Sequence, residues 1–254
     1  MAKRRAEVPG AVIAAYIREL EQAFDRERLD AYSPPDGDPL SMVTTYFWNV
    51  ALCKELYPVL GGVEVTMRNA IHDTLVVHRN APDWYDEPGL LRPRETEAIR
   101  KAKQDIVAAG RTVVPGRVVA AVTFGFWTGM LSSLYGESPK GSRLWTRDDN
   151  ALLGVAFPHL DPRHRHRSYV HRRFNTIRLL RNRIVHHEPI WQGVRLQSGV
   201  LISLATLHSD MLEAIGWVDP AVRASIAAID RFPACLDRGH RAIKAELTAY
   251  LQRR

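Results

Sequence analysis

Cysteine is scarce in this sequence, and long apolar runs are missing from it. The two cysteines, Cys53 and Cys235, stand far apart in apolar segments, which favours buried free thiols over a disulfide and fits a reducing cytoplasm. No run of about 18 apolar residues occurs, so a membrane span is not expected. The basic residues at 1–7 precede no long apolar core and do not resemble a signal peptide. We therefore expect a cytoplasmic protein that does not bind a membrane.

Several motifs of metal-dependent and nucleotide-dependent enzymes are also missing. The chain has no His-Glu-x-x-His and no Cys-x-x-Cys, so His186 and Glu188 remain as two isolated potential metal ligands. It has no glycine-rich phosphate loop and no Gly-x-Ser-x-Gly nucleophile turn. We expect neither a metal nor another cofactor.

Lysine is scarce as well, whereas arginine is abundant. The chain has 6 Lys against 29 Arg and a net charge of +7. Codon bias in an alanine-rich chain would explain this ratio, and so would selection for the bidentate phosphate contacts that arginine makes. The segment from His159 to Glu188 holds 8 Arg and 2 acidic residues, which gives 8 − 2 = +6, and 6 of the 10 histidines. Such a patch attracts polyanions, and nucleic acid above all.

The sequence shows no convincing strand pattern, repeat or linker, and apolar residues recur at helical spacing. We predict an all-α fold with one domain over residues 8–254, in which 217–254 can form a subsidiary helical unit, after a basic tail at 1–7. Pro58 is expected to interrupt or kink the chain between two helices. The expected helices cover residues 9–29, 41–56, 60–77, 94–109, 118–135, 147–156, 162–187, 197–215, 220–229 and 236–250.

The stretch from Arg181 to Pro189 concentrates polar chemistry at the end of the basic helix. Pro189 disfavours helical geometry at Glu188, so it should stop the helix near His187. At about 100° per residue, Asn182 and His186 share one side of the helix. The opposite side is apolar and should face the core, with Phe174, Ile177, Leu180 and Ile184.

This arrangement suits RNA cleavage by attack of a ribose 2′-hydroxyl on the adjacent phosphate. That reaction needs an acid, a base and an anion clamp. A histidine such as His186 can transfer the proton, Arg181 can hold the phosphate, and Asn182 can orient the histidine or bind the phosphate. Arginine and histidine also suit a helix C-terminus for electrostatic reasons alone. The spacing by itself therefore leaves both a catalytic site and a solvated helix end open.

A second polar segment lies on the predicted helix at 60–77. Glu64 and Arg68 are four residues apart and can pair on one face, and Asn69 and His72 follow them. The segment is interpretable as the solvated face of an amphipathic helix or as a contributor to a functional site.

Four segments together resemble the Abi-like proteins of bacterial abortive phage infection, which belong to the HEPN superfamily. Arg181-Asn182-x-x-x-His186 is similar to the Arg-x(4–6)-His motif of HEPN domains, in the form found in ribonuclease members. The matching segments occur in the family's order within about residues 10–215. They are Tyr-Phe-Trp-Asn at 46–49, Val-Glu-Val-Thr-Met-Arg-Asn-Ala-Ile at 63–71, Phe-Gly-Phe-Trp at 124–127 and Leu-Arg-Asn-Arg-Ile-Val-His-His-Glu-Pro-Ile at 180–190.

The resemblance implies an all-helical HEPN-type bundle, to which the C-terminal helices after Gly216 are an addition. It implies a homodimer in which two copies of the motif form one composite cleft. It also implies metal-independent endoribonuclease activity, held in check until phage infection or another signal. RNA, a second copy of the chain, and an antitoxin or phage-derived trigger are the partners that follow.

The resemblance also implies roles for single residues. Arg181 and His186 would form the catalytic pair, with Asn182 in support. The neighbouring polar residues that would support the site are His187, Glu188, Glu64, Arg68 and Asn69. Spacing selects His186 over His187, and ion pairing on the helix is the structural alternative for Glu64 and Arg68.

The remaining arginines of the basic helix are predicted to bind RNA, at Arg172, Arg173, Arg178 and Arg183. Two alternatives to an endoribonuclease remain. Many HEPN proteins bind nucleic acid or partners without cutting, so a non-catalytic RNA-binding or regulatory module is the first. The second is a structural dimer with a basic face.

Overall fold

A computed structural model describes residues 8–33, 37–136, 144–145 and 150–254 of the chain. The fold is all-α, as predicted: helices make up 73% of the residues that the structure describes, and these residues contain one two-stranded sheet. The elements are α1 (Gly10–Phe24), α2 (Arg26–Asp30), α3 (Pro39–Arg79), η1 (Trp84–Asp86), α4 (Pro93–Ala108), α5 (Pro115–Ala121), α6 (Phe124–Met130), η2 (Ser133–Tyr135), α7 (Asn150–Ala156), η4 (Pro162–His164), α8 (Arg167–Val185), β1 (Val194–Arg195), β2 (Leu201–Ile202), α9 (Leu204–Val218), α10 (Pro220–Ile229) and α11 (Phe232–Leu251).

The chain forms two compact units, each assembled from segments that are distant in sequence. Unit 1 comprises residues 1–57, 182–206 and 230–254, and unit 2 comprises residues 58–181 and 207–229. Helices α3 and α8 each contribute residues to both units. The segment 217–254, predicted as a subsidiary unit, is divided between them, and the basic tail at 1–7 lies outside the described residues.

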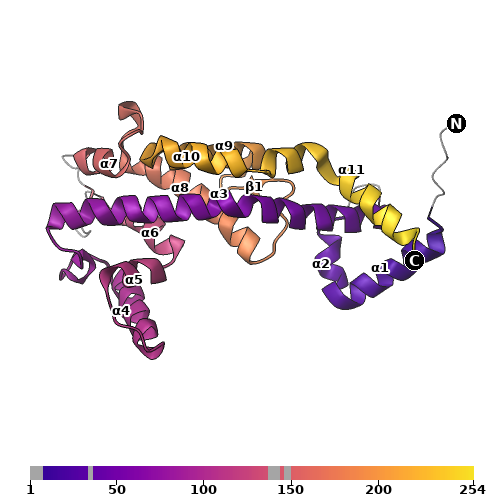
Figure 1. Cartoon of the computed structure of the whole chain (residues 1–254), viewed down its shortest axis with the longest axis horizontal. Helices are drawn as coiled ribbons and strands as arrows, with labels where there is room; N and C mark the ends of the chain where they lie inside the picture. Colours follow the sequence, from indigo (N-terminus) through magenta and orange to yellow (C-terminus); the bar gives the residue numbers. More distant parts are fainter. Residues whose placement is uncertain (1–7, 34–36, 137–143, 146–149) are drawn as a thin grey trace. The chain divides into compact units, whose positions relative to one another are not determined.

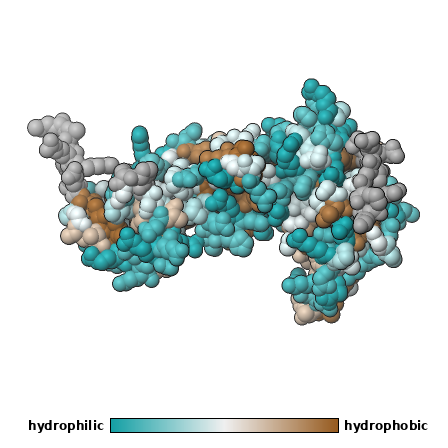
Figure 2. Space-filling view, turned by 180° about the vertical axis from the view of Figure 1, so that it is seen from behind, coloured by the Kyte–Doolittle hydropathy of each residue, from teal (hydrophilic) through white to brown (hydrophobic). Residues whose placement is uncertain are grey.

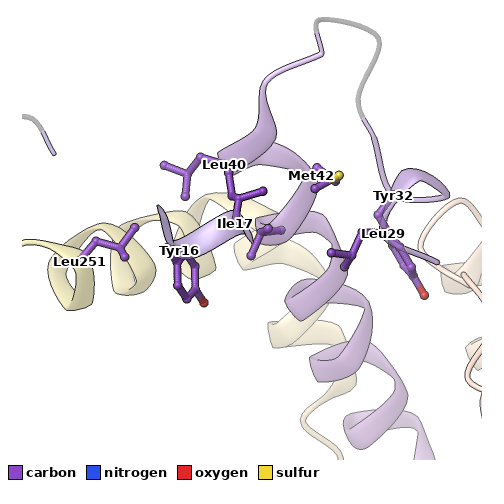
Figure 3. Close-up of a cluster of buried hydrophobic side chains, with 8 residues drawn as sticks. Tyr16, Ile17, Leu29, Tyr32, Leu40, Met42 and Leu251 are labelled. Atoms are coloured by element: carbon purple, nitrogen blue, oxygen red, sulfur yellow. The ribbon is translucent and has the colours of Figure 1, made fainter. Parts of the chain in front are cut away.

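Unit 1 has an apolar core built by its helices (Figure 3). Its buried side chains are Tyr16 and Ile17 of α1, Leu29 of α2, Tyr32, then Leu40, Met42 and Val43 of α3, and Leu251 of α11. The helix predicted over residues 9–29 is in fact two helices. Asp25 takes a left-handed backbone conformation, with φ of 66°, and this ends α1 before α2 begins.

Unit 2 is built around large aromatic side chains. Trp84 and Trp127 pack with ring centroids 6.3 Å apart. The rings of Phe157 and Phe174 lie 5.6 Å apart, and Trp217 of α9 packs edge-on against Phe174 at 5.9 Å. These side chains bury large apolar areas, so they anchor α8 and α9 to each other within the unit.

Of the two outcomes predicted at Pro58, an interruption or a kink, the interruption is wrong, because α3 runs without a break from Pro39 to Arg79 (Figure 1). Proline lacks a backbone N–H, so the helix loses one hydrogen bond there. Leu56, Val59 and Leu60 surround the proline in sequence and are buried. Burial of these side chains favours one continuous helix over the two helices that were predicted.

The single buried helix predicted over residues 118–135 is also wrong, since α5, α6 and η2 occupy this region. Val122 is extended, and the Thr123 hydroxyl accepts a hydrogen bond from the Phe126 N–H at 3.3 Å. Thr123 thus caps a new helix, as threonine commonly does. Apolar residues continue through the whole segment 118–135, so composition alone does not show that α6 begins after Thr123.

Other boundaries shift for local reasons. Asp161 caps the short η4, and α8 begins only at Arg167 instead of at residue 162. The β1–β2 hairpin was not predicted, and it moves the start of α9 to Leu204. The predicted α10 is confirmed, α11 begins earlier than expected, and the predicted helix start at Arg147 lies outside the described residues.

Hydrophilic side chains cover most of the face displayed in Figure 2, with smaller hydrophobic patches between them. Within the described ranges, no helix combines the length and the apolar character that crossing a membrane requires. Cys53 and Cys235 are free thiols, as predicted; Cys235 is buried and Cys53 is half-buried.

Candidate functional site

The end of α8 is closed by two characteristic backbone hydrogen bonds. The His187 N–H donates to the Ile184 carbonyl at 3.1 Å, and the Glu188 N–H donates to the Arg183 carbonyl at 2.8 Å. His187 has φ of 56°, the left-handed conformation that glycine most often supplies at this position. The helix therefore ends through a turn centred on His187.

This turn corrects the predicted helix end. The helix stops at Val185 rather than near His187, and the chain has already left helical geometry before Pro189. Pro189 is consistent with the end of the helix but does not set it. The histidine at 187 adopts the left-handed conformation that histidine tolerates better than most residues.

The turn exposes both histidine side chains to solvent. His186 follows the last helical residue, and its N–H donates to the Asn182 carbonyl at 2.9 Å. In this described region, no hydrogen bond joins the Asn182 and His186 side chains. The predicted orienting role of Asn182 stays a prediction.

Arg181 and Asn182 fall in different compact units, although they are consecutive in α8. Arg181 is the last residue of unit 2 on this helix, and Asn182 is the first of unit 1. Within unit 2, the Arg181 Nε lies 3.9 Å from the Glu64 Oε2 of α3, and both side chains are half-buried. The structure thus brings together two residues that were predicted to line one cleft.

The expected pairing within α3 takes a different form. The Arg68 Nε donates to the Asn69 side-chain oxygen at 3.2 Å, while Glu64 faces Arg181. His72, on the same helix, accepts a hydrogen bond from the Trp84 indole N–H at 3.0 Å. Desolvation on partial burial lowers the pKa of His72, which favours the neutral ring that accepts this hydrogen bond.

Asn49 secures the chain segment that follows α8. Its side-chain oxygen accepts hydrogen bonds from the Ile190 N–H at 2.7 Å and the Trp191 N–H at 3.1 Å. Its amide group donates to the Tyr32 hydroxyl at 3.3 Å. Asn49 is 3% exposed, so these partners take the place of water. It belongs to the segment at 46–49, but residue chemistry alone had given it no role.

Arg28 is a second residue that the sequence did not point to. Its guanidinium donates to the His187 carbonyl at 2.9 Å, across 159 residues of sequence. Both residues line a cavity of about 380 Å³ in unit 1, together with Tyr32 and Cys53. Burial raises the pKa of Tyr32 to about 12 and that of Cys53 to about 11, so both are neutral near pH 7. Cys53 is therefore a poor nucleophile.

The predicted RNA-binding arginines differ in how far their charges are compensated. Arg173 lies 2.8 Å from Asp210 and 2.7 Å from Glu213, and its guanidinium sits over the Trp217 ring. These contacts favour a structural role for Arg173. Arg183 has an acidic partner as well, since its guanidinium lies 3.3 Å from the Glu188 carboxylate. The partners of the other two are neutral: Arg172 lies over the Tyr169 ring, and Arg178 donates to the Asn175 side chain.

The part of the chain that the structure describes contains no group of three or more His, Cys, Asp or Glu side chains able to hold a metal ion.

Comparison of the chain with protein-family models, curated proteins and solved structures finds no match. The site is therefore interpreted from its own residues and geometry.

The left-handed backbone conformation of His187 leads to a prediction about stability. His187→Gly should raise the free energy of unfolding by about 0.5–1 kcal/mol, because glycine adopts the left-handed conformation without the steric cost. The Arg28 hydrogen bond to the backbone carbonyl is retained in this variant. Urea denaturation measures the change, and a loss of stability would show that the imidazole of His187 makes a net stabilising contribution.

Proposed function

We propose that this protein is a metal-independent endoribonuclease of HEPN type that acts in phage defence by abortive infection. The observation that carries the proposal is the exposed His186 at the C-terminal end of α8, preceded by Arg181 and Asn182 in the ribonuclease form of the motif. The all-helical fold and the basic composition of α8 support it.

The proposed reaction is transesterification within RNA. A histidine base removes the proton of a ribose 2′-hydroxyl, and the 2′-oxygen attacks the adjacent phosphorus. The bond from phosphorus to the 5′-oxygen breaks, and an acid protonates that oxygen. The products carry a 2′,3′-cyclic phosphate and a 5′-hydroxyl, so the reaction consumes no water and needs no metal.

His186 is the acid or base in this scheme, since imidazole exchanges protons near neutral pH. Arg181 stabilises the negative charge that gathers on the phosphate oxygens. In the proposed homodimer, two copies of the motif meet in one composite cleft, so one histidine can serve as base and the other as acid. Glu64, at 3.9 Å from Arg181, would hold this guanidinium in the absence of RNA.

A non-catalytic RNA-binding module is the second candidate. It is favoured by the absence, among the described residues, of a hydrogen bond that fixes the His186 ring, because catalytic histidines usually have an orienting partner. Such a module would bind RNA with a steep salt dependence and leave the RNA intact.

The purified protein should cleave RNA in the presence of EDTA and leave 2′,3′-cyclic phosphate ends. Arg181→Ala should reduce this cleavage about 10²–10³-fold, since a group that stabilises the transition-state charge is lost. Arg163→Ala is a matched control, because Arg163 is an exposed arginine whose ion pair is with Asp161. Gel analysis with end-group labelling measures the products. Binding without cleavage would establish the second candidate, and a requirement for added metal would contradict the first.

A further inference from the structure

A second cavity, of about 510 Å³, lies within unit 2 and shares no residue with the Arg181–His186 motif. Its walls come from the start of α4, from α6 and the residues after it, and from the middle of α8. A cavity of this volume is in the range that holds small-molecule ligands.

The cavity is lined by arginines that have no carboxylate partner. Arg92, Arg94 and Arg178 line it, and none of the three forms an ion pair with an acidic side chain in the described parts of the chain. Arg178 donates to the Asn175 side-chain oxygen through Nε at 3.2 Å and through a terminal nitrogen at 2.8 Å. This neutral partner orients the guanidinium without compensating its charge.

One carboxylate lines the cavity, and it is already engaged. Glu95 is buried, and its Oε2 accepts a hydrogen bond from the Tyr135 hydroxyl at 2.8 Å. The same hydroxyl accepts a hydrogen bond from the Arg92 backbone N–H at 3.0 Å. With three arginines and one glutamate, the lining carries 3 − 1 = +2 when its histidine is neutral.

The N-terminus of α4 adds positive potential to this lining. The 16-residue helix begins at Pro93, and its N-cap residue, Arg92, makes no side-chain capping hydrogen bond. The free amide groups of a helix N-terminus favour anions. Here they reinforce the arginine cluster, which supplies the net charge.

The α8 wall contributes two neutral hydrogen-bonding groups beside Arg178. His171, Asn175 and Arg178 follow one another at helical spacing and all line the cavity. Desolvation, together with the charges of Arg167 and Arg178, lowers the pKa of His171, so its ring is neutral near pH 7. A neutral imidazole can donate one hydrogen bond to a ligand oxygen.

We propose that this cavity binds the diphosphate group of a small phosphorylated ligand. The start of α4 and the middle of α8 both contribute arginines to the lining of one space that is much larger than a single phosphate. Arginine forms bidentate hydrogen bonds with phosphate oxygens, and adjacent phosphates match the lining charge of +2. Inorganic pyrophosphate and the nucleoside diphosphates and triphosphates share this chemistry. The site lies apart from the proposed ribonuclease motif, so it would serve as a regulatory or second-ligand site.

Calorimetric titration of the full-length protein with pyrophosphate, ADP, AMP and inorganic phosphate tests this inference. Pyrophosphate and ADP should bind at least tenfold more tightly than AMP and phosphate, as one-phosphate probes engage fewer arginines. Equal affinity for ADP and pyrophosphate would show recognition of the phosphates alone, and tighter binding of ADP would show an added nucleoside contact. Either result supports the site.

Two variants locate the binding. Arg94→Ala changes an exposed side chain and should preserve the fold, and Arg178→Gln changes the lining residue contributed by α8. Each should weaken pyrophosphate binding at least tenfold. Arg100→Ala is the matched control on α4, because Arg100 pairs with Glu97 and does not line the cavity. Pyrophosphate binding that is absent, or that survives both variants, would overturn the inference. The inference would also fail if the protein did not bind pyrophosphate and these two variants lost RNA binding instead.

The outcome is distinguishable from that of the ribonuclease proposal. His186→Ala should retain pyrophosphate binding, because His186 does not line this cavity. A protein that binds pyrophosphate through Arg94 and Arg178 but cleaves no RNA would support the cavity and reject the ribonuclease. RNA cleavage without pyrophosphate binding would do the reverse.

Discussion

His186→Ala is expected to lower the rate of RNA cleavage by about 10²–10⁴-fold, the usual contribution of a positioned acid or base. His186 is exposed immediately after the last residue of α8, and the structure gives it no role in packing. The variant should therefore fold like the wild type and bind RNA with similar affinity. Single-turnover cleavage of a labelled RNA in EDTA, with protein in excess, measures the effect on the chemical step.

The adjacent histidine provides the control. His187→Gly removes the second imidazole at the position where glycine suits the backbone best, so it should retain cleavage close to the wild-type rate. The reverse pattern, with activity lost at His187 and kept at His186, would assign the chemistry to His187. Full activity in both variants would show that neither histidine at the end of α8 takes part in the reaction.

The same comparison can be made in cells. If the protein arrests growth by cutting RNA, induced expression of the wild type should stop growth and His186→Ala should relieve the arrest. Arrest by both proteins, at equal levels, would indicate that toxicity comes from RNA binding or from another activity. Steep salt dependence of RNA binding would then point to the basic face of the protein.

Local signals in the sequence predicted much of the secondary structure. Asp219 and Pro220 place the start of α10 correctly, because an N-cap residue followed by proline is a specific helix signal. Apolar periodicity also identified the buried side of α8, and Phe174, Ile177 and Leu180 are fully buried. These predictions rest on neighbours within one or two helical turns.

Tertiary packing overrode local signals elsewhere. Pro58 is a strong helix breaker by itself, yet buried residues on both sides hold α3 together. The two-residue strands β1 and β2 are too short to show an alternating pattern. Gly193, with φ of 97°, precedes this hairpin, and a Cβ atom there would lie 2.2 Å from the Ile202 carbonyl oxygen. The requirement for glycine is visible only once the hairpin is known.

The candidate site divides in the same way. The order Arg181, Asn182, His186 is a local pattern and could be predicted, whereas the groups that hold the surrounding chain come from far away. Arg28 binds the His187 carbonyl across 159 residues, and Asn49 binds the Ile190 amide across 141. No spacing rule links such residues, so only the folded chain reveals them.

The largest expected loss of stability follows from Asn49. Asn49→Ala should lower the free energy of unfolding by about 3–4 kcal/mol, because the Ile190 and Trp191 amides and the Tyr32 hydroxyl each lose a partner. Burial at 3% exposure leaves little room for water to replace the lost oxygen. Urea denaturation of the full-length protein measures the change, with exposed Asn69→Ala as the control, expected within about 0.5 kcal/mol of the wild type.

Two further measurements separate the hydrogen bonds from general loss of packing. Tyr32→Phe removes one of the three partners and should cost about 1 kcal/mol, well below the cost of Asn49→Ala. Hydrogen exchange of the Ile190 and Trp191 amides should accelerate in Asn49→Ala and stay slow in Tyr32→Phe, because only the first variant removes their acceptor. A change below 1 kcal/mol in Asn49→Ala, with both amides still protected, would mean that the segment after α8 is held by packing of the buried Ile190 side chain instead.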